Sequence, residues 1–384
     1  MAELFLSLAI LLFSAKLLGE IFERLNLSSL VGEITAGIIV GPLLGVIVPS
    51  EELKLITDFG IIFMLFLIGL STKFDEVKGN MYVGIALAAA GCILAFVGGL
   101  IVGNIFFGSV EAGIILGVAV ISTSTAITLR SLADIGEFQS RPYKLALAVD
   151  IADEVIAILA LALLTTYFTV GIVKPWETVS LFFVILGFFF FVLTAGSSIA
   201  RKLLSAFRGM RDEQIMVSVP LVVLFLTAFV SEHVGIAAVT GAFLAGVALN
   251  KSPLVEPLVL PKIKAISYGF FIPIFFAYSA VLLDLASVVQ FLPVIAALVL
   301  IVSVGKVIGC GLIAGFFGYN EHEQKVIGIG MIPHGEYSIV MAQLALVAGF
   351  IRADMYTVVI AFVILSIVIT PVLLRWFTRR PGRR

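Results

Sequence analysis

Charged side chains are scarce in this sequence. They make up 13 % of its 384 residues, which is about half the share that a soluble domain carries. Hydrophobic residues make up 61 %, and the mean hydropathy is +1.20. A soluble domain of this length cannot hide so much apolar surface in one core. The scarcity of charge therefore excludes a soluble protein and predicts that most of the chain faces lipid or other buried helices.

Cysteine is nearly absent, and its two residues, Cys92 and Cys310, both lie in apolar runs. This pattern excludes a disulfide framework and a thiolate metal site. Residues 322–326 read His-Glu-Gln-Lys-Val, which departs from the zinc pattern His-Glu-x-x-His, and the phosphate-binding loop G-x-x-x-x-G-K-[ST] does not occur. The formal net charge of −1 gives no sign of a nucleic-acid partner. We therefore expect no enzyme activity, no catalytic residues and no bound cofactor.

Long apolar runs are what the sequence has in abundance. A spanning helix needs about 20 mostly apolar residues. Thirteen such segments cover residues 4–23, 29–48, 54–71, 80–107, 111–129, 143–170, 177–200, 214–231, 234–250, 258–283, 289–317, 324–349 and 353–374. Only Glu232 and His233 separate segments 214–231 and 234–250, so one long helix is the alternative there. The loops reach about a dozen residues, which leaves no room for a soluble regulatory domain.

Lysine and arginine are distributed asymmetrically about these segments. Of the 24 basic residues, nineteen lie in the C-terminal tail, in loops that follow odd-numbered segments or at the segment ends beside those loops. Lys54, Lys174 and Arg352 lie on the opposite side, and Lys16 and Lys306 lie inside segments. Because basic loops stay on the cytoplasmic side, we expect a multi-pass protein of the cytoplasmic membrane with its N-terminus outside and its C-terminus in the cytoplasm.

Two segments carry helix-breaking residues at corresponding positions. Residues 121–126 of segment five read Ile-Ser-Thr-Ser-Thr-Ala, and these hydroxyls compete for helical backbone bonds. In segment twelve, Pro333 and Gly335 are poor residues for a helix interior. A shift of seven segments relates the two breaks. We therefore expect an all-α polytopic membrane protein with two inverted six-helix repeats, segments one to six and eight to thirteen, each with one discontinuous helix.

Ionisable residues inside apolar segments indicate an ion or proton path, because charge at membrane depth costs at least about 2.5–3.5 kcal/mol. Segment six carries Asp150, Asp153 and Glu154, whose spacings of three and four place them on one helix face. Clustered carboxylates cannot all stay charged there, so the cluster is expected to hold either a proton or a hard cation. For Asp150, nearer the cytoplasmic end, a merely solvated position is the alternative.

Three further polar residues lie in the apolar segments of the second half. Lys306 is in the middle of segment eleven, too deep to reach the membrane surface, so it needs an acidic partner. The acidic cluster is the expected partner, and a permanent structural ion pair is the alternative to a role in cation exchange. At the break in segment twelve, Glu336 either faces a cavity or forms a structural pair. His334 either senses pH or is structural. In segment two, Glu33 is expected to be structural or interfacial, and a funnel-lining position is the alternative.

Residues 32–42 read Gly-Glu-Ile-Thr-Ala-Gly-Ile-Ile-Val-Gly-Pro, which closely resembles the signature G-E-(I/L)-x-A-G-(I/L)-x-x-G-P of the monovalent cation:proton antiporter superfamily. The resemblance is to the branch that contains bacterial and archaeal Na+/H+ exchangers and Kef-type potassium efflux systems. Further matches follow in the expected order at residues 63–70, 122–125, 241–246, 270–276 and 305–309. Together they span the chain, which makes the resemblance specific although each motif is short.

The resemblance implies a single transmembrane exchanger domain over residues 1–384 that works as a homodimer in the lipid bilayer. A mobile core would comprise about residues 80–170 and 289–374, and a dimerisation scaffold about residues 1–79 and 177–283. The two broken helices, segments five and twelve, would cross in the core.

The family's paired acidic site falls on Asp153 and Glu154, which would bind Na+, with Glu154 in the position of the essential carboxylate. A register with Asp153 as the essential acid is the alternative. The hydroxyls of Thr123, Ser124 and Thr125 would supply further oxygen ligands for ions or protons. The expected coupling or structural charges are Lys306, Glu336, Asp150 and His334, and His334 stands where the family has arginine.

The mechanism that the resemblance implies is alternating access. Protons and one Na+ or Li+ ion would compete for the same carboxylates, and the exchange would serve pH homeostasis. A K+/H+ antiporter or Kef-like K+ efflux protein is the alternative within the family. Outside it, a cation-coupled solute symporter remains open, whereas an intramembrane aspartyl enzyme is disfavoured, because Asp150 and Asp153 lie on one helix.

Overall fold

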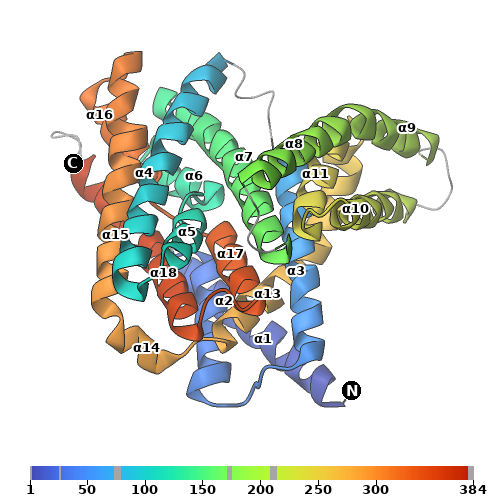
Figure 1. Cartoon of the computed structure of the whole chain (residues 1–384), viewed down its shortest axis with the longest axis horizontal. Coiled ribbons are helices and arrows are strands. Elements are labelled where there is room, and N and C mark those ends of the chain that lie inside the picture. The colour runs from blue at the N-terminus through green and yellow to red at the C-terminus, as the bar shows by residue number, and fades with distance from the viewer. Residues whose placement is uncertain (1, 26, 73–78, 171–174, 208–213, 379–384) are drawn as a thin grey trace. The chain divides into compact units, whose positions relative to one another are not determined.

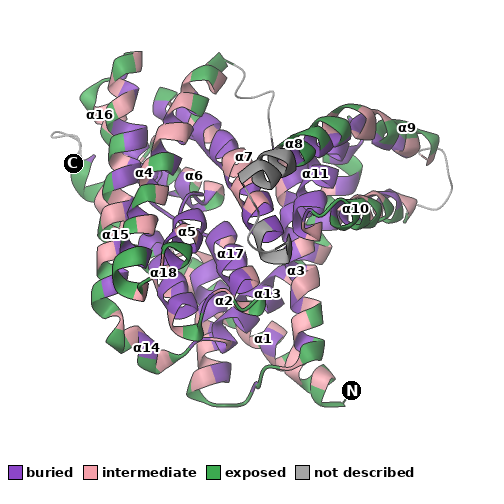
Figure 2. Ribbon diagram, in the orientation of Figure 1, coloured by how far each residue is buried: buried purple, intermediate pink, exposed green. Residues whose placement is uncertain are grey.

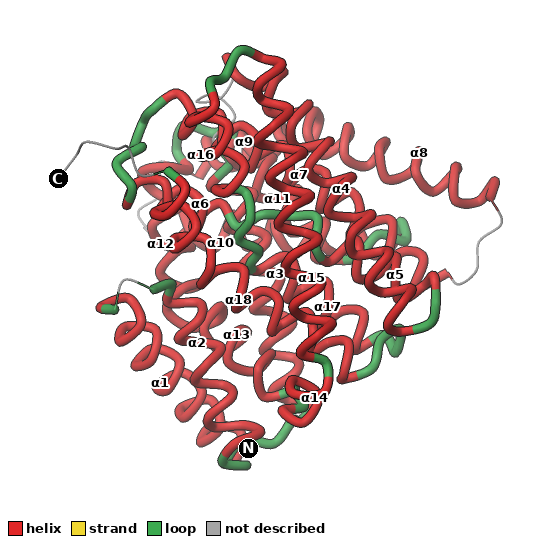
Figure 3. Tube along the Cα trace, turned by 90° about the vertical axis from the view of Figure 1, so that its left-hand side faces the viewer, coloured by secondary structure: helices red, strands yellow, loops and turns green. Residues whose placement is uncertain are grey.

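The computed structural model of the chain describes residues 2–25, 27–72, 79–170, 175–207 and 214–378, without the side chains of residues 167–182. Every regular element in these ranges is a helix, as Figure 3 shows. The predicted all-α class is therefore confirmed.

Eight helical stretches in the described part are long and apolar enough to cross a membrane, judged by length and composition. They are Ala2–Arg24, Glu51–Ser71, Met81–Phe107, Phe183–Phe207, Ile215–His233, Val255–Val281, Leu292–Phe317 and Ala353–Phe377. Four shorter apolar helices cover Ser29–Leu43, Val110–Ala119, Ala238–Asn250 and Glu336–Val347. Helix α7 (Arg141–Val170) adds the predicted segment at 143–170. These elements agree with a multi-pass membrane protein.

The chain folds into two compact units. Unit 1 comprises Met1–Phe22, Gly32–Thr72 and Leu161–Leu282. Its helices are α1 (Ala2–Arg24), α2 (Ser29–Ile38) with the π-turn η1 (Ile39–Leu43), α3 (Glu51–Ser71), α8 (Pro175–Phe191), η3 (Val192–Gly196), α9 (Ser197–Phe207), α10 (Ile215–His233), α11 (Ala238–Asn250), η4 (Val255–Val259), α12 (Leu260–Ile266), η5 (Ser267–Phe271) and α13 (Ile272–Val281).

Helices α3 and α11 of unit 1 pack with their backbones in contact. A Cβ atom built on Gly69 would lie 2.2 Å from the Phe243 carbonyl oxygen, and one built on Gly246 would lie 2.3 Å from the Phe66 carbonyl oxygen. Small residues at such a crossing are how membrane helices approach closely. The glycines therefore fix the distance between α3 and α11.

Helices α10 and α11 are separate, so the alternative of one long helix is wrong. Glu232 and His233 lie in the last turn of α10, and the connection is residues 234–237. Gly235 adopts a positive φ of 81° there, which favours glycine. The Ser231 hydroxyl donates hydrogen bonds to the carbonyl oxygens of Ile236 and Ala237, so the turn satisfies its own backbone.

Unit 2 comprises Glu23–Val31, Lys73–Ala160 and Leu283–Arg384. Its helices are α4 (Met81–Phe107), α5 (Val110–Ala119), α6 (Thr125–Asp134), most of α7, α14 (Leu285–Gln290), α15 (Leu292–Lys306), η6 (Val307–Leu312), η7 (Gly315–Phe317), α16 (Glu321–Gly330), α17 (Glu336–Val347) and α18 (Ala353–Phe377). Figure 1 shows α4 and α15 side by side, with α5 next to α4 and α17 next to α5. Helices α5 and α17 are buried along most of their length (Figure 2).

We predict that Gly246→Ala lowers the free energy of unfolding by about 1–3 kcal/mol, because the added methyl group overpacks the crossing of α3 and α11. The thermal unfolding midpoint of the detergent-solubilised protein measures the effect. Gly269→Ala in the same unit is the matched control, since a Cβ atom there meets nothing within 4 Å. Equal midpoints for the two variants would contradict the close packing described above.

Candidate functional site

Both predicted helix breaks are present in unit 2. Residues 120–124 separate α5 from α6, and residues 331–335 separate α16 from α17, so the two interruptions have the same length. Ser124 has extended φ and ψ of −88° and 103°. A Cβ atom on Gly335 would lie 2.8 Å from the Ser124 side chain. Only glycine fits at that point, because the two interruptions cross there.

Direct hydrogen bonds join the two interruptions. The backbone amide of Ser124 donates to the Pro333 carbonyl oxygen at 2.8 Å. The hydroxyl of Thr123 donates to the Met331 carbonyl oxygen at 3.2 Å, and that of Thr128 donates to the Gly330 carbonyl oxygen at 2.9 Å. The hydroxyl cluster that predicted a break therefore also supplies the bonds that hold the crossing together.

The side chains of Lys306 and His334 meet the buried backbone carbonyl groups that follow α5. The Lys306 ammonium donates to the Ile121 carbonyl oxygen at 2.5 Å, and His334 Nε2 lies 2.8 Å from the Val120 carbonyl oxygen. The C-terminal end of a helix carries partial negative charge, which cations stabilise. Lys306 itself is the last residue of α15 before the π-helical turn η6, a local widening that is frequent at functional sites.

Asp153 of α7 forms a buried ion pair with Lys306. The Lys306 Nζ and Asp153 Oδ2 atoms lie 3.0 Å apart, and each side chain is 1 % exposed. The backbone amide of Thr123 also donates to Oδ2 at 2.9 Å, and the Cys92 thiol donates to Oδ1. A buried ion pair is tolerated when further hydrogen bonds satisfy its remaining groups. Asp153 is therefore fully engaged by donors from three parts of unit 2.

Two glutamates lie beside the first residues of the half-helices that follow the breaks, Glu154 from α7 and Glu336 as the first residue of α17. Glu154 Oε1 accepts a hydrogen bond from the hydroxyl of Thr125, the first residue of α6, at 3.0 Å. Glu336, the first residue of α17, accepts one from the Ser124 hydroxyl at 3.3 Å. Both glutamates are only partly buried. Helix N-termini favour negative charge, so the neighbouring hydroxyls and the helix ends hold two carboxylates in one region.

The structure brings together eight of the nine predicted site residues. They are Thr123, Ser124, Thr125, Asp153, Glu154, Lys306, His334 and Glu336. His334 is fully buried, and its Nδ1 atom lies 2.6 Å from the Ile332 carbonyl oxygen. Its ring thus bridges the two interruptions, and its own amide donates to the Ser366 hydroxyl at 3.0 Å.

Asp150 is the predicted residue that no described hydrogen bond joins to the other eight. It is 0 % exposed, so the alternative of a solvated position is wrong. Both of its carboxylate oxygens lack a hydrogen-bond partner among the described residues. In unit 1, Glu33 pairs with Lys16 at 3.4 Å, as expected for a structural residue.

Cys92 is the site residue that sequence reasoning missed. Its sequence neighbours indicate only an apolar run, whereas the structure places its thiol 2.8 Å from Asp153 Oδ1. One feature of the sequence could have indicated it: Cys92 is a sulfhydryl in the middle of a spanning helix that otherwise has few polar groups.

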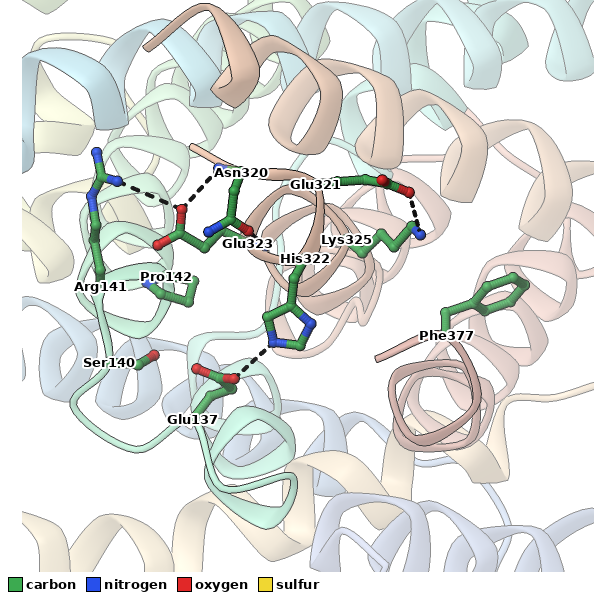
Figure 4. Close-up of a pocket in the computed structure, with 10 residues that line it drawn as sticks. All are labelled: Glu137, Ser140, Arg141, Pro142, Asn320, Glu321, His322, Glu323, Lys325 and Phe377. Atoms are coloured by element: carbon green, nitrogen blue, oxygen red, sulfur yellow. Dashed lines mark hydrogen bonds and ion pairs between the residues drawn. The ribbon is translucent and has the colours of Figure 1, made fainter. Parts of the chain in front are cut away.

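A pocket of about 530 Å³ lies in unit 2 at residues that the sequence did not single out as a site (Figure 4). A hydrogen bond between His322 and Glu137 at 3.0 Å and an ion pair between Arg141 and Glu323 at 3.6 Å join its walls. At its rim the Lys325 ammonium hydrogen bonds to Glu321 and holds the pKa of that exposed carboxyl below its usual range. Its lining includes none of the predicted ion-site residues.

Comparison with known proteins extends the match to almost the whole chain. The family described as "Sodium/hydrogen exchanger, transmembrane" matches residues 9–380. The Na(+)/H(+)-K(+) antiporter GerN of Bacillus cereus is 30 % identical over 378 residues, which cover 97 % of this chain and 96 % of GerN. The high-affinity Na(+)/H(+) antiporter NhaS3 of Synechocystis is 28 % identical over 428 residues, which cover 98 % and 90 % of the two chains.

The fold is also that of a solved structure. The sodium proton antiporter MjNhaP1 from Methanocaldococcus jannaschii superposes with a TM-score of 0.69 over 98 % of each chain, at 16 % sequence identity. This likeness concerns the fold alone, whereas the family match rests on sequence. The chain therefore belongs to the transmembrane sodium/hydrogen exchanger family.

Proposed function

We propose that the protein exchanges Na+ or Li+ for H+ across the cytoplasmic membrane by alternating access. One observation carries this proposal: two partly buried carboxylates, Glu154 and Glu336, lie at the crossing of two interrupted helices, beside a buried Asp153–Lys306 pair. Carboxylate and hydroxyl oxygens suit a hard cation, and the same carboxylates bind protons. The similarity to the antiporters GerN and NhaS3 supports the same exchange.

Glu154 is the essential ion-binding acid in this proposal. Asp153 already accepts from Lys306, a backbone amide and a thiol, whereas the hydrogen bond that Glu154 accepts comes from the Thr125 hydroxyl. A carboxylate held by a neutral hydroxyl exchanges its partner more readily than one held by an ammonium group. Na+ therefore binds Glu154 first, and Asp153 joins it when Lys306 withdraws. The hydroxyls of Thr123, Ser124 and Thr125 are the further ligands.

Coupling follows from competition for this one site. The charged, empty site is costly to move through the hydrophobic barrier. Either H+ or Na+ neutralises it, so the protein turns over only when one of them is bound. Lys306, Glu336, Asp150 and His334 set the charge balance around the site. No bound cofactor and no enzymatic step takes part; Na+ and H+ are the transported ions.

Unit 2 is the mobile core in this proposal, and unit 1 is the scaffold through which two copies form a homodimer. The support is that every residue proposed to bind or balance the ion belongs to unit 2. The bounds of unit 2 also resemble those expected for the core from the sequence. The N-terminus lies outside and the C-terminus in the cytoplasm, which rests on the distribution of basic residues.

We predict that Glu154→Gln abolishes Na+ exchange driven by a pH gradient in proteoliposomes, because a neutral amide neither releases a proton nor attracts a cation. Dequenching of an entrapped pH-sensitive dye on Na+ addition measures the rate. Glu321→Gln, at an exposed surface pair, is the matched control and should keep the wild-type rate. Undiminished exchange by Glu154→Gln would refute the assignment of this acid.

K+/H+ exchange is the second candidate, because GerN is named as a Na(+)/H(+)-K(+) antiporter. The K(+) efflux antiporter 4 of Arabidopsis thaliana is also similar, at 24 % identity over 390 residues. The same dequenching assay with Na+, Li+ and K+ at equal concentration separates the two. We expect strong responses to Na+ and Li+ and a weak one to K+. A K+ response at least as large as that to Na+ would replace the first function with the second.

We predict that Lys306→Met lowers the free energy of unfolding by about 3–5 kcal/mol, because it leaves the Asp153 charge buried and unpaired. The double variant Lys306→Met/Asp153→Leu should recover most of this loss, since neither charge remains. Thermal unfolding in detergent measures both variants. If the double variant is as unstable as the single one, the loss comes from packing around Lys306 and not from an orphaned charge.

A further inference from the structure

The carboxylate of Asp153 is satisfied unevenly. Oδ2 accepts from the Lys306 ammonium and from the Thr123 amide. Oδ1 accepts from the Cys92 thiol at 2.8 Å, and within the described ranges no other donor reaches it. Because the Asp153 side chain is 1 % exposed, water does not replace a missing donor. One oxygen of the central ion pair thus depends on a single thiol.

Close packing of α4 on η6 places Cys92 in reach of this oxygen. A Cβ atom on Gly309 would lie 2.6 Å from the Cα atom of Gly91, and one on Gly91 would lie 2.5 Å from the Cys310 sulfur. The two backbones therefore touch one residue before Cys92 and one turn after Lys306. A short side chain at position 92 then reaches the same carboxylate that Lys306 holds from the other helix.

The Cys92 thiol can donate a hydrogen bond to Asp153 without neutralising the negative charge of this carboxylate, as a second cation would. A buried carboxylate oxygen without a donor is costly. A neutral S–H group removes part of that cost without cancelling the negative charge, since it is a weak, uncharged donor. Asp153 therefore stays supported while its ammonium partner is free to be exchanged for another cation.

We propose that Cys92 is a positioning residue of the cation site, which holds Asp153 Oδ1 so that this carboxylate can pass from Lys306 to the transported cation. The proposal rests on the Na+/H+ exchange proposed above. Loss of the thiol donor destabilises charged Asp153 and so weakens the cation-bound form. The step that moves the loaded core is unaffected, because Cys92 itself binds no ion.

Cys310 provides a matched control within the same unit. It is the second cysteine of the chain, it is fully buried, and its thiol donates to the Leu87 carbonyl oxygen at 3.5 Å instead of to a carboxylate. Replacing either cysteine with alanine removes one sulfur atom from the interior. Only the change at Cys92 removes a donor from a charged group, because it leaves Asp153 Oδ1 without its hydrogen bond.

The test is the initial rate of exchange against Na+ concentration in proteoliposomes at fixed pH. We expect Cys92→Ala to raise KM for Na+ about tenfold with a maximal rate within about twofold of wild type. Cys92→Ser should restore KM, because a hydroxyl donates to the same oxygen, and Cys310→Ala should resemble wild type. Equal KM values for Cys92→Ala and Cys310→Ala would overturn the proposal. So would a Cys92→Ser variant as impaired as Cys92→Ala, which would assign the effect to packing.

A second measurement does not depend on the folding of Cys92→Ala. In Cys310→Ala protein the single remaining thiol gives one S–H stretching band in the infrared spectrum, whose position reports the strength of its hydrogen bond. We expect Asp153→Asn in that background to shift the band, because a charged acceptor becomes neutral. An unchanged band would show that the Cys92 thiol does not donate to Asp153, and would overturn the proposal. If the band is unchanged while Cys310→Ala exchanges Na+ normally, the proposed role of Cys92 has failed and the proposed Na+/H+ exchange has not.

Discussion

Two helices are interrupted inside apolar segments, and each interruption exposes backbone amides and carbonyl groups that no water from the bilayer core can satisfy. Many of the polar contacts of the site satisfy these backbone groups. Lys306 and His334 meet carbonyl oxygens that follow α5, Asp153 accepts from the Thr123 amide, and Ser366 accepts from the His334 amide. The groups that complete the backbone are the same groups that create a charged centre in the membrane interior.

The geometry of this centre depends on glycine at points of closest approach. Gly335 lets one interruption pass over the Ser124 side chain of the other, and Gly91 and Gly309 let α4 and η6 touch. In lipid such contacts replace the hydrophobic drive that brings helices together in water. A larger side chain at any of these positions would move the donors of Asp153 or the hydroxyls at the crossing by more than a hydrogen bond tolerates.

The carboxylates of the site differ in what holds them. Asp153 is deeply buried and has three donors, while Glu154 and Glu336 are partly buried and accept from hydroxyl groups of Thr125 and Ser124. Asp153 therefore carries a charge that its donors hold in place. Glu154 and Glu336, which accept from hydroxyl groups, can exchange a proton or a cation more readily. This difference links the structure to the exchange of ions for protons that we propose, and it distinguishes Glu154 from Asp153 on physical grounds that their adjacency in sequence does not supply.

The sequence by itself determined the membrane class, the places of both helix breaks and the shared face of Asp150, Asp153 and Glu154. These features depend on composition, on local backbone chemistry at the hydroxyl run and at Pro333, and on the helical period. Only the tertiary structure decided that Asp150 is buried with no hydrogen-bond partner in the part of the chain that the structure describes. It also decided that Lys306 pairs with Asp153, that Cys92 completes that carboxylate and that Lys16 pairs with Glu33. Such pairings join helices far apart in the chain, and side-chain spacing along one helix says nothing about which neighbour comes within hydrogen-bond distance.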